Sequence, residues 1–134
     1  MIKNILITGG AGYIGSHVAE ILHKDKKNIF IVDNLSTGFK NLINKKTLLY
    51  NLNILKTSKL RKIILENKID SVIHLAASLS IGIGEKYPKF YYKNNVLGTK
   101  SLMKACQNSS VKNFIFSSTA AVYKDGQKIV SEKS

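Results

Sequence analysis

The chain has 134 residues, the length of one ordinary domain, and a hydrophobic content of 44% favours a globular protein with its own core. No apolar run approaches the roughly 20 residues that a membrane-spanning helix needs, and the apolar stretch at 2–7 is short enough to be a strand rather than a signal peptide. Cys106 is the single cysteine, which excludes an internal disulfide and a cysteine-based metal site. We therefore expect a cytoplasmic protein with no membrane association and no bound metal.

The net charge of +13 raises the question of a nucleic-acid partner. Arginine is the side chain that reads bases and holds phosphates with two hydrogen bonds, yet Arg61 is the only arginine. The lysines are scattered through every segment of the chain and do not form one basic run. We expect a solvated basic surface and no nucleic-acid binding.

A glycine-rich turn joins an apolar strand at 3–8 to a helix. Gly9, Gly12 and Gly15 lie at three-residue intervals in this turn, and the helical pattern begins there. Glycines in such a turn permit the tight bend, the approach of a pyrophosphate to the backbone, and close packing of helix on strand. Free N–H groups at the start of the helix also favour phosphate. The turn therefore predicts a dinucleotide site.

The second strand, at 28–33, ends in an acidic residue. Asp33 follows Gly15 by 18 residues, close to the spacing of the acid that hydrogen-bonds the adenosine ribose in dinucleotide-binding folds. Its negative charge would repel a 2′-phosphate, so we expect NAD and not NADP. The alternative is an acid that only caps the strand. The turn-forming residues 34–38 come next and are expected beside the adenosine.

The rest of the chain continues the alternation of strands and helices. The expected elements are a short strand at 47–51, a helix from Thr57 or Ser58 to 67–68, a strand at 71–75, a glycine-bearing loop at 78–86, a long helix from Pro88, and a strand at 113–118. His74, near the end of the fourth strand, has no acid or nucleophile nearby in sequence. We expect it to be a packed residue and not a catalytic base.

Large apolar residues predict the buried faces of two helices. For the first helix the predicted face is Ile14, Val18, Ile21 and Leu22. For the long helix it is Tyr92, Val96, Thr99, Met103 and Cys106. Gly98 lies in the middle of the long helix, where glycine costs about 1 kcal/mol relative to alanine, which indicates close packing or a ligand.

These elements predict an α/β fold with a doubly wound parallel sheet and the strand order 3-2-1-4-5. Ligands bind such sheets at the carboxyl ends of the strands, beside the point where the strand order reverses. The glycine turn, Asp33, Ala76, Ala77 and Thr119 should meet at that edge. We expect one domain at 1–124, incomplete at its carboxyl end, and a tail at 125–134 without a core pattern.

Five segments carry a family resemblance: TGGAGYIGSH at 8–17, DNLSTG at 33–38, HLAA at 74–77, YYKNNVLGT at 91–99 and FIFSSTAAVY at 114–123. They resemble the amino-terminal part of the extended short-chain dehydrogenases/reductases, the NAD-dependent epimerases and dehydratases. Within that family the UDP-glucose 4-epimerases are the most similar. The resemblance covers nearly the whole chain and implies a Rossmann-type NAD-binding fold.

The resemblance implies particular cofactor contacts. The backbone of Tyr13 and Ile14 would meet the pyrophosphate, and Asn53 would replace the family's aspartate at the adenine. Leu75, Ala76 and Ala77 would line the nicotinamide side. Leu79 stands where some epimerases have a lysine, so a charge contact is missing there. The full set of expected cofactor-binding residues is Gly9, Gly12, Tyr13, Ile14, Gly15, Asp33, Asn34, Leu35, Ser36, Thr37, Gly38, Asn53, Ile54, Leu75, Ala76, Ala77, Leu79 and Asn94.

The resemblance also implies a catalytic role for Thr119, which matches the Ser/Thr that binds the sugar hydroxyl being oxidised. Its family partners are a tyrosine acid/base and a lysine four residues later, about 25 residues beyond the threonine. Tyr123 and Lys128 are five residues apart and do not match that pair. We expect the substrate domain to be absent, the chain alone to be inactive, and apolar surface to be exposed near Ile115 and Val122.

The expected function is therefore that of the NAD-binding portion of a nucleotide-sugar epimerase. The parent reaction interconverts UDP-glucose and UDP-galactose by transient oxidation at C4, and the parent enzyme is expected to be a homodimer. Two alternatives stay open: a fragment of a nucleotide-sugar 4,6-dehydratase or decarboxylase, and a non-catalytic NAD-binding protein. A Tyr-x-x-x-Lys motif encoded downstream would settle the parent class.

Overall fold

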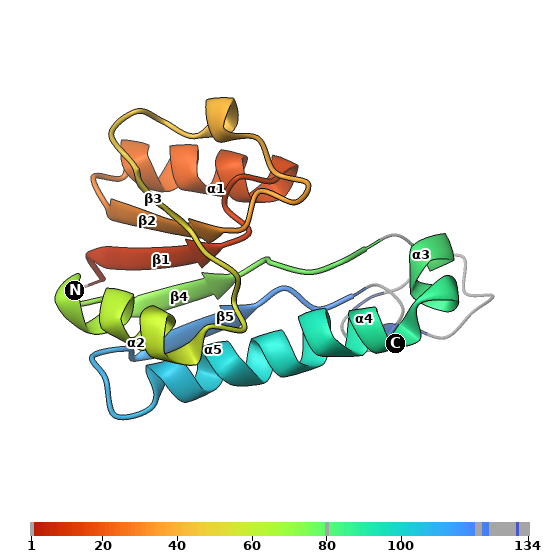
Figure 1. Cartoon of the computed structure of the whole chain (residues 1–134). Helices are drawn as coiled ribbons and strands as arrows, with labels where there is room; N and C mark the ends of the chain where they lie inside the picture. The colour runs from red at the N-terminus through yellow and green to blue at the C-terminus, as the bar shows by residue number, and fades with distance from the viewer. Residues whose placement is uncertain (1, 80, 120–121, 124–130, 132–134) are drawn as a thin grey trace.

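A five-stranded parallel sheet forms the centre of the computed structural model, which describes residues 2–79, 81–119, 122–123 and 131 (Figure 1). The strand order is β3-β2-β1-β4-β5, which confirms the predicted topology. The strands are β1 (Asn4–Thr8), β2 (Asn28–Asp33), β3 (Leu48–Asn51), β4 (Ser71–His74) and β5 (Asn113–Phe116). The predicted tail at 125–134 lies outside the described residues, except for Ser131.

The helices cover both faces of this sheet (Figure 1). They are α1 (Tyr13–Lys24), the 3₁₀ turn η1 (Lys40–Leu42), α2 (Thr57–Glu66), α3 (Ile81–Lys86), α4 (Pro88–Tyr91), the π-helical η2 (Tyr92–Leu97) and α5 (Gly98–Cys106). The last three are continuous and form the long helix predicted from Pro88. The predicted loop at 78–86 is wrong in part, because α3 occupies most of it.

β1 lies between β2 and β4 and is the most buried strand, with Ile7 paired to Ile31 on one side and to Ile73 on the other. Side chains alternate between two cores. Leu6 packs in the core shared with α2 and the long helix, and Ile5 packs in the core shared with α1. This burial fixes the carboxyl ends of β1, β2 and β4 relative to one another.

The predicted buried face of α1 is only half right. Val18 and Leu22 pack against the core, but Ile14 and Ile21 are each 60% exposed. The residues buried on α1 are Gly15, Ser16 and Ala19. Small residues allow the helix axis to approach the sheet closely, and counting only large apolar side chains misses such a face.

The predicted buried face of the long helix is wrong for Tyr92, Val96 and Met103, which are exposed. Thr99 and Cys106 are half-buried, and Cys106 packs against the core. Tyr92 and Met103 are more than half exposed, whereas α5 buries Gly98, Leu102 and Ala105. A Cβ atom on Gly98 would lie 2.6 Å from Cδ1 of Ile54, so close packing explains this glycine.

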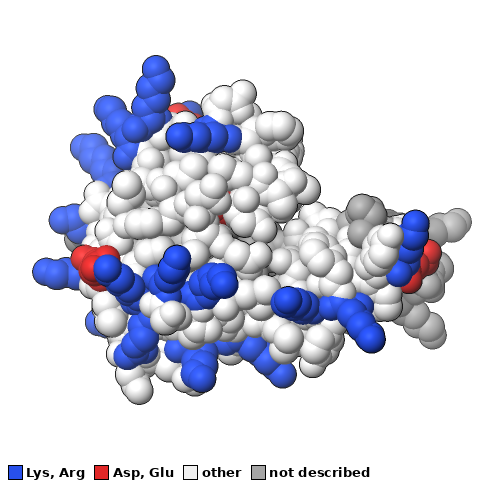
Figure 2. Space-filling view, in the orientation of Figure 1, with Lys and Arg blue, Asp and Glu red and all other residues white. Residues whose placement is uncertain are grey.

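The surface agrees with two further expectations. Ile115 and Val122 are 58% and 68% exposed, as predicted. Lysine and arginine side chains form several separate groups on the face that Figure 2 shows and do not gather in one patch. No helix among the described residues is both long and apolar enough to cross a membrane.

Candidate functional site

The turn between β1 and α1 lies directly against the segment that follows β4. Gly9 has a φ of 73°, which glycine adopts without strain, and its N–H donates to the carbonyl of Val32 at 2.9 Å. A Cβ atom on Gly9 would lie 2.7 Å from the backbone nitrogen of Ala76. Because Gly9 has no side chain, the predicted pyrophosphate turn can lie directly against the predicted nicotinamide side at Ala76.

Gly12 and Gly15 have different surroundings. A Cβ atom on Gly15 would lie 2.7 Å from Cα of Gly10 and closer still to the carbonyl oxygen of Gly9, so this glycine permits packing within the turn. A Cβ atom on Gly12 would meet, among the described residues, only the carbonyl oxygen of Gly9, at 3.3 Å. Gly12 thus borders open space, as a backbone that approaches a ligand requires.

Gly12 is also the N-cap of α1. As a glycine it provides no side chain to cap the helix, and the first turn of α1 contains no acidic residue. The N–H groups and the positive end of the helix dipole are therefore available to an anion at the open side of Gly12.

Asp33 ends β2 next to this turn and is 9% exposed. Its Oδ2 accepts a hydrogen bond from the N–H of Ala11 at 3.0 Å, and its Oδ1 accepts one from the N–H of Leu35 at 2.8 Å. The carboxylate therefore ties the glycine turn to the end of β2. Each carboxylate oxygen has a second lone pair, so Asp33 can still accept hydrogen bonds from ribose hydroxyls.

Residues 34–38 fold back over the glycine turn. The Asn34 side-chain oxygen accepts hydrogen bonds from the N–H and the hydroxyl of Ser36, at 3.1 and 2.8 Å. Gly38 lies against Ala11, since a Cβ atom there would be 2.8 Å from Cβ of Ala11. Asn34, Ser36 and Thr37 are exposed around Asp33, where the sequence predicts the adenosine.

The predicted adenine side lies beside Asp33 as well, because the N–H of Leu52 donates to the Asp33 carbonyl at 3.0 Å. The side-chain oxygen of Asn53 accepts from the N–H of Leu55 at 2.9 Å. Ile54 is 5% exposed, and its side chain packs into the core. Only the backbone of Ile54 is therefore available for a contact with adenine, a role that stays a prediction.

The segment after β4 contains the residues predicted for the nicotinamide side. The N–H of Leu75 donates to the carbonyl of Thr8 at 3.0 Å, and Ala76 lies against Gly9. Ala77 and Leu79 are exposed, Leu79 by 81%. The small side chains of Ala76 and Ala77 leave room at this edge for the nicotinamide ring of the predicted cofactor.

Tyr13, Ile14 and Thr119 are three other predicted site residues, and their side chains are exposed. The side chains of Tyr13 and Ile14 are 78% and 60% exposed, and the phosphate contact through their backbone stays a prediction. Thr119 is exposed on the segment that leaves β5, and that segment starts beside β4 where the N–H of Ser117 donates to the His74 carbonyl at 3.1 Å. The catalytic role of Thr119 stays a prediction.

A hydrogen-bonded chain of polar side chains, Thr8, His74 and Thr99, lies beneath this edge. The sequence analysis predicted that His74 and Thr99 pack inward but did not predict their hydrogen bond. His74 is 2% exposed, with Nδ1 2.6 Å from the Thr8 hydroxyl and Nε2 2.8 Å from the Thr99 hydroxyl. The Thr99 hydroxyl donates to the carbonyl of Asn95 at 2.6 Å, so it accepts the hydrogen bond from His74 Nε2–H. Burial lowers the pKa of His74 to about 4, so the ring is neutral at pH 7 and Nδ1 accepts from Thr8. The expectation of a packed histidine is confirmed.

Two polar residues of the long helix contact the segment after β4. Asn94, predicted at the cofactor, donates from Nδ2 to the Ser78 hydroxyl at 3.0 Å. Asn95, which the sequence analysis missed, bonds to both backbone groups of Ser78. A signal was present: Asn95 shares a 4-3-4-3 spacing with Tyr91, Gly98, Leu102 and Ala105, which is the face that the helix turns inward.

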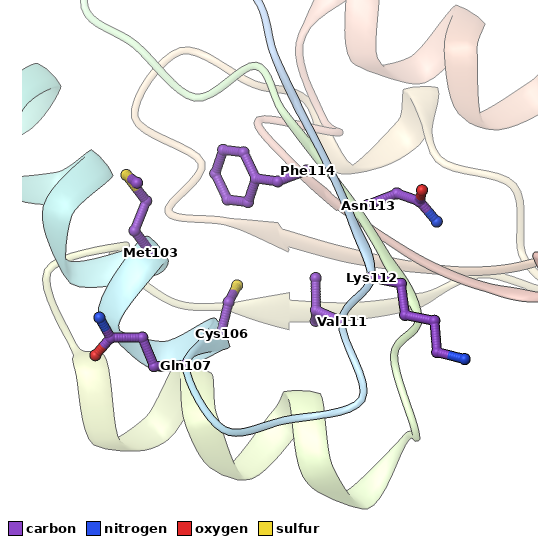
Figure 3. A pocket seen from close by; sticks show the side chains of 7 residues that line it. All are labelled: Met103, Cys106, Gln107, Val111, Lys112, Asn113 and Phe114. Atoms are coloured by element: carbon purple, nitrogen blue, oxygen red, sulfur yellow. The ribbon is translucent and has the colours of Figure 1, made fainter.

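The hollow in Figure 3 lies away from this site, between the end of α5 and the start of β5. Its volume is about 250 Å³, and Lys112 and Asn113 extend away from Cys106 (Figure 3). Burial raises the pKa of the Cys106 thiol to about 11, so the thiol is protonated and weakly nucleophilic at neutral pH. In the described part of the chain, no group of three or more His, Cys, Asp or Glu residues is placed to hold a metal ion.

The model of the NAD dependent epimerase/dehydratase family matches residues 5–134. The UDP-glucose 4-epimerase of Halalkalibacterium halodurans is 40% identical over 130 residues, which are 97% of this chain and 39% of that protein. The chain thus spans about two fifths of the length of this relative.

Solved structures agree with the sequence comparison. The UDP-glucose 4-epimerase from Brucella ovis in complex with NAD has a TM-score of 0.86 at 39% identity, covering 90% of this chain and 37% of that one. The Thermotoga maritima UDP-glucose 4-epimerase with UDP-glucose has a TM-score of 0.84 at 39% identity, covering 87% and 38%. The glycine turn, the sheet order and these matches agree, and the chain belongs to the NAD dependent epimerase/dehydratase family, with similarity to the amino-terminal part of its UDP-glucose 4-epimerases.

Proposed function

We propose that the chain binds NAD at the carboxyl edge of its sheet and forms the NAD-binding portion of a nucleotide-sugar 4-epimerase. The observation that carries this proposal is the geometry at Gly12. Gly12 is the N-cap of α1 without a capping side chain, it borders open space, and Asp33 holds the turn in place through Ala11. A pyrophosphate fits a site with free N–H groups, no opposing acid in the first turn and no side chain in the way.

NAD is favoured over NADP because of Asp33. The hydrogen bonds to its carboxylate come from two backbone N–H groups, and among the described residues no ion pair joins it to a lysine or to Arg61. The exposed residues that follow it are Asn34 and Ser36, which carry no charge. A 2′-phosphate at this position would lie beside an uncompensated carboxylate.

The substrate of the whole enzyme is proposed to be UDP-glucose or UDP-galactose, since the matched relatives are UDP-glucose 4-epimerases. When bound, NAD supplies reversible acceptance of the hydride from C4 of the sugar. In this chain Leu75, Ala76 and Ala77 would border the nicotinamide, and the Thr119 hydroxyl would bind the sugar hydroxyl. The 134 residues contain no tyrosine followed four positions later by lysine, so we propose that this polypeptide alone does not turn over.

Two further properties belong to the same proposal. The exposed stripe of Tyr92, Val96 and Met103 on the long helix supports self-association of the parent enzyme. The free, half-buried Cys106 suits a reducing compartment such as the cytoplasm. We also propose that the parent enzyme acts in galactose metabolism.

Titration calorimetry with NAD tests the proposed function. Gly12→Val places a branched side chain at the open edge of the turn and is expected to abolish NAD binding with an unchanged circular dichroism spectrum. Gly82→Val is the matched control, since a Cβ atom on Gly82 would meet no described atom within 4 Å, and it should bind NAD as the parent chain does. Equal NAD affinity in the two folded variants would contradict the phosphate-turn assignment.

A further inference from the structure

The base of a bound dinucleotide should lie beyond β3, because the proposed site runs outward across the sheet. The glycine turn follows β1, Asp33 ends β2, and β3 is the next strand in the order β3-β2-β1. Asp33 is paired with Asn51 in the parallel register, and its carbonyl accepts the N–H of Leu52 at 3.0 Å. A nucleotide with its phosphate at the turn and its ribose at Asp33 would therefore place its base against residues 52–55.

Asn53 begins the tight turn that follows β3, and a backbone group of this turn sets the orientation of its carboxamide. The Asn53 carbonyl accepts the N–H of Lys56 at 3.0 Å, and Asn53 Oδ1 accepts the N–H of Leu55 at 2.9 Å. The opposite orientation of the carboxamide would place the Nδ2 donor against the Leu55 donor, which is unfavourable. The oxygen of this side chain therefore serves the turn.

The Nδ2 group of Asn53 remains for a ligand. Asn53 is half-buried, and among the described residues no hydrogen bond joins its Nδ2 to another group. In that part of the chain every buried side-chain nitrogen or oxygen has a hydrogen-bond partner, so Nδ2 must reach solvent. The N–H of Ile54, the next residue, likewise donates to no described acceptor. Residues 53 and 54 thus present two neighbouring donors where the base should lie.

Purine bases differ in how they match two neighbouring donors. Adenine presents an acceptor and a donor side by side, because its 6-amino group lies next to N1 and N7. A 6-oxopurine such as hypoxanthine or guanine presents two acceptors side by side, O6 and N7. A 6-oxopurine can therefore satisfy both donors, whereas adenine turns its amino group toward one of them and leaves a hydrogen bond unmade.

We propose that Asn53 is a specificity-determining residue for the base of the dinucleotide, because its Nδ2 donor and the Ile54 N–H favour a 6-oxopurine over adenine. This inference rests on the proposed dinucleotide site and concerns its base alone. The expected ribose and phosphate contacts, at Asp33 and the glycine turn, are the same for NAD and for nicotinamide hypoxanthine dinucleotide. A difference in affinity between these two dinucleotides therefore reports on the base.

Titration calorimetry on the 134-residue chain with these two dinucleotides tests the inference. The hypoxanthine dinucleotide should bind about tenfold more tightly than NAD, since it makes one more hydrogen bond and avoids one contact between donors. Asn53→Asp keeps an oxygen for the Leu55 N–H and replaces the Nδ2 donor with an acceptor, so this variant should bind NAD more tightly. The ratio of the two affinities is the measured quantity, because an added charge or a disturbed turn changes both affinities together.

Asn41→Asp is the matched control, since it makes the same change at an exposed residue of η1 and should leave the ratio unchanged. Circular dichroism checks that both variants are folded, and the comparison in the parent chain needs no variant. NAD affinity equal to or tighter than that for the hypoxanthine dinucleotide in the parent chain would overturn the inference. An equal ratio in folded Asn53→Asp and in the parent chain would overturn it as well. If the parent chain binds neither dinucleotide, the proposed function itself fails.

Discussion

A comparison of alanine at Gly15 and at Gly12 separates the packing role of the glycine turn from its binding role. At Gly15 the new Cβ atom would lie 2.7 Å from Cα of Gly10 and would overlap the carbonyl of Gly9. Both neighbours are backbone, so the turn must move. Overpacking of this kind costs about 3 kcal/mol, and alanine recovers up to about 1 kcal/mol through its better helix propensity.

The expected net loss for Gly15→Ala is therefore about 2 kcal/mol, which lowers the melting temperature by roughly 8 °C for a domain of this size. At Gly12 the Cβ atom meets only the Gly9 oxygen at 3.3 Å among the described atoms, and the backbone there has φ −78° and ψ 174°, which any residue adopts. Gly12→Ala should change stability by less than about 1 kcal/mol.

Thermal unfolding followed by circular dichroism measures the stability, and titration calorimetry on each folded variant measures NAD affinity. Gly15→Ala should lose stability, whereas Gly12→Ala should keep its melting temperature and lose NAD affinity. A Gly15→Ala variant as stable as the parent, or a Gly12→Ala variant that melts lower and binds NAD normally, would refute the separation.

Two more predictions concern buried and hydrogen-bonded titratable groups. Burial lowers the pKa of His74 to about 4, so as the pH falls below 6.5 the histidine is protonated in the unfolded chain before it is protonated in the folded one. The free energy of unfolding should therefore drop by about 3 kcal/mol between pH 6.5 and 4. Urea titrations should show that His74→Gln lacks this pH-dependent drop. Asp70 has a lowered pKa, because hydrogen bonds from the backbone N–H groups of Asn4 and Lys3 and from Ser71 outweigh the opposing effect of burial. The contribution of Asp70 to the free energy of unfolding is present near pH 7 and is lost as the pH falls through that lowered pKa. Asp70→Asn should lower the free energy of unfolding by about 1 kcal/mol at pH 7 and by little at pH 2. An equal loss at both pH values would contradict this reasoning.

The topology, and the meeting of the glycine turn, Asp33 and Ala76 at one edge of the sheet, could be predicted from the sequence because both depend on strong local signals. Apolar strands, the glycine turn and Asp33 at the end of β2 define the sheet edge without any knowledge of packing. The resemblance added the nicotinamide side, and the structure places Ala76 against Gly9.

The helix faces could not be predicted by counting large apolar residues. Ile14 and Ile21 of α1 are exposed, and Gly98 and Ala105 are buried on the long helix, because both helices approach their neighbours through small residues. Asn95 was missed for a related reason. A polar side chain on an inward face is unfavourable by hydrophobicity alone, and its partner, the backbone of Ser78, carries no sequence signal.

The most direct test of the central claim is an amide NMR titration of the chain with NAD, with NADP as the comparison. We predict that NAD shifts the signals of residues 9–15, 33–38 and 75–79, with no change around the hollow between α5 and β5, and that NADP causes the same shifts only at much higher concentration. Shifts confined to residues 103–114, or equal responses to NADP, would contradict the account.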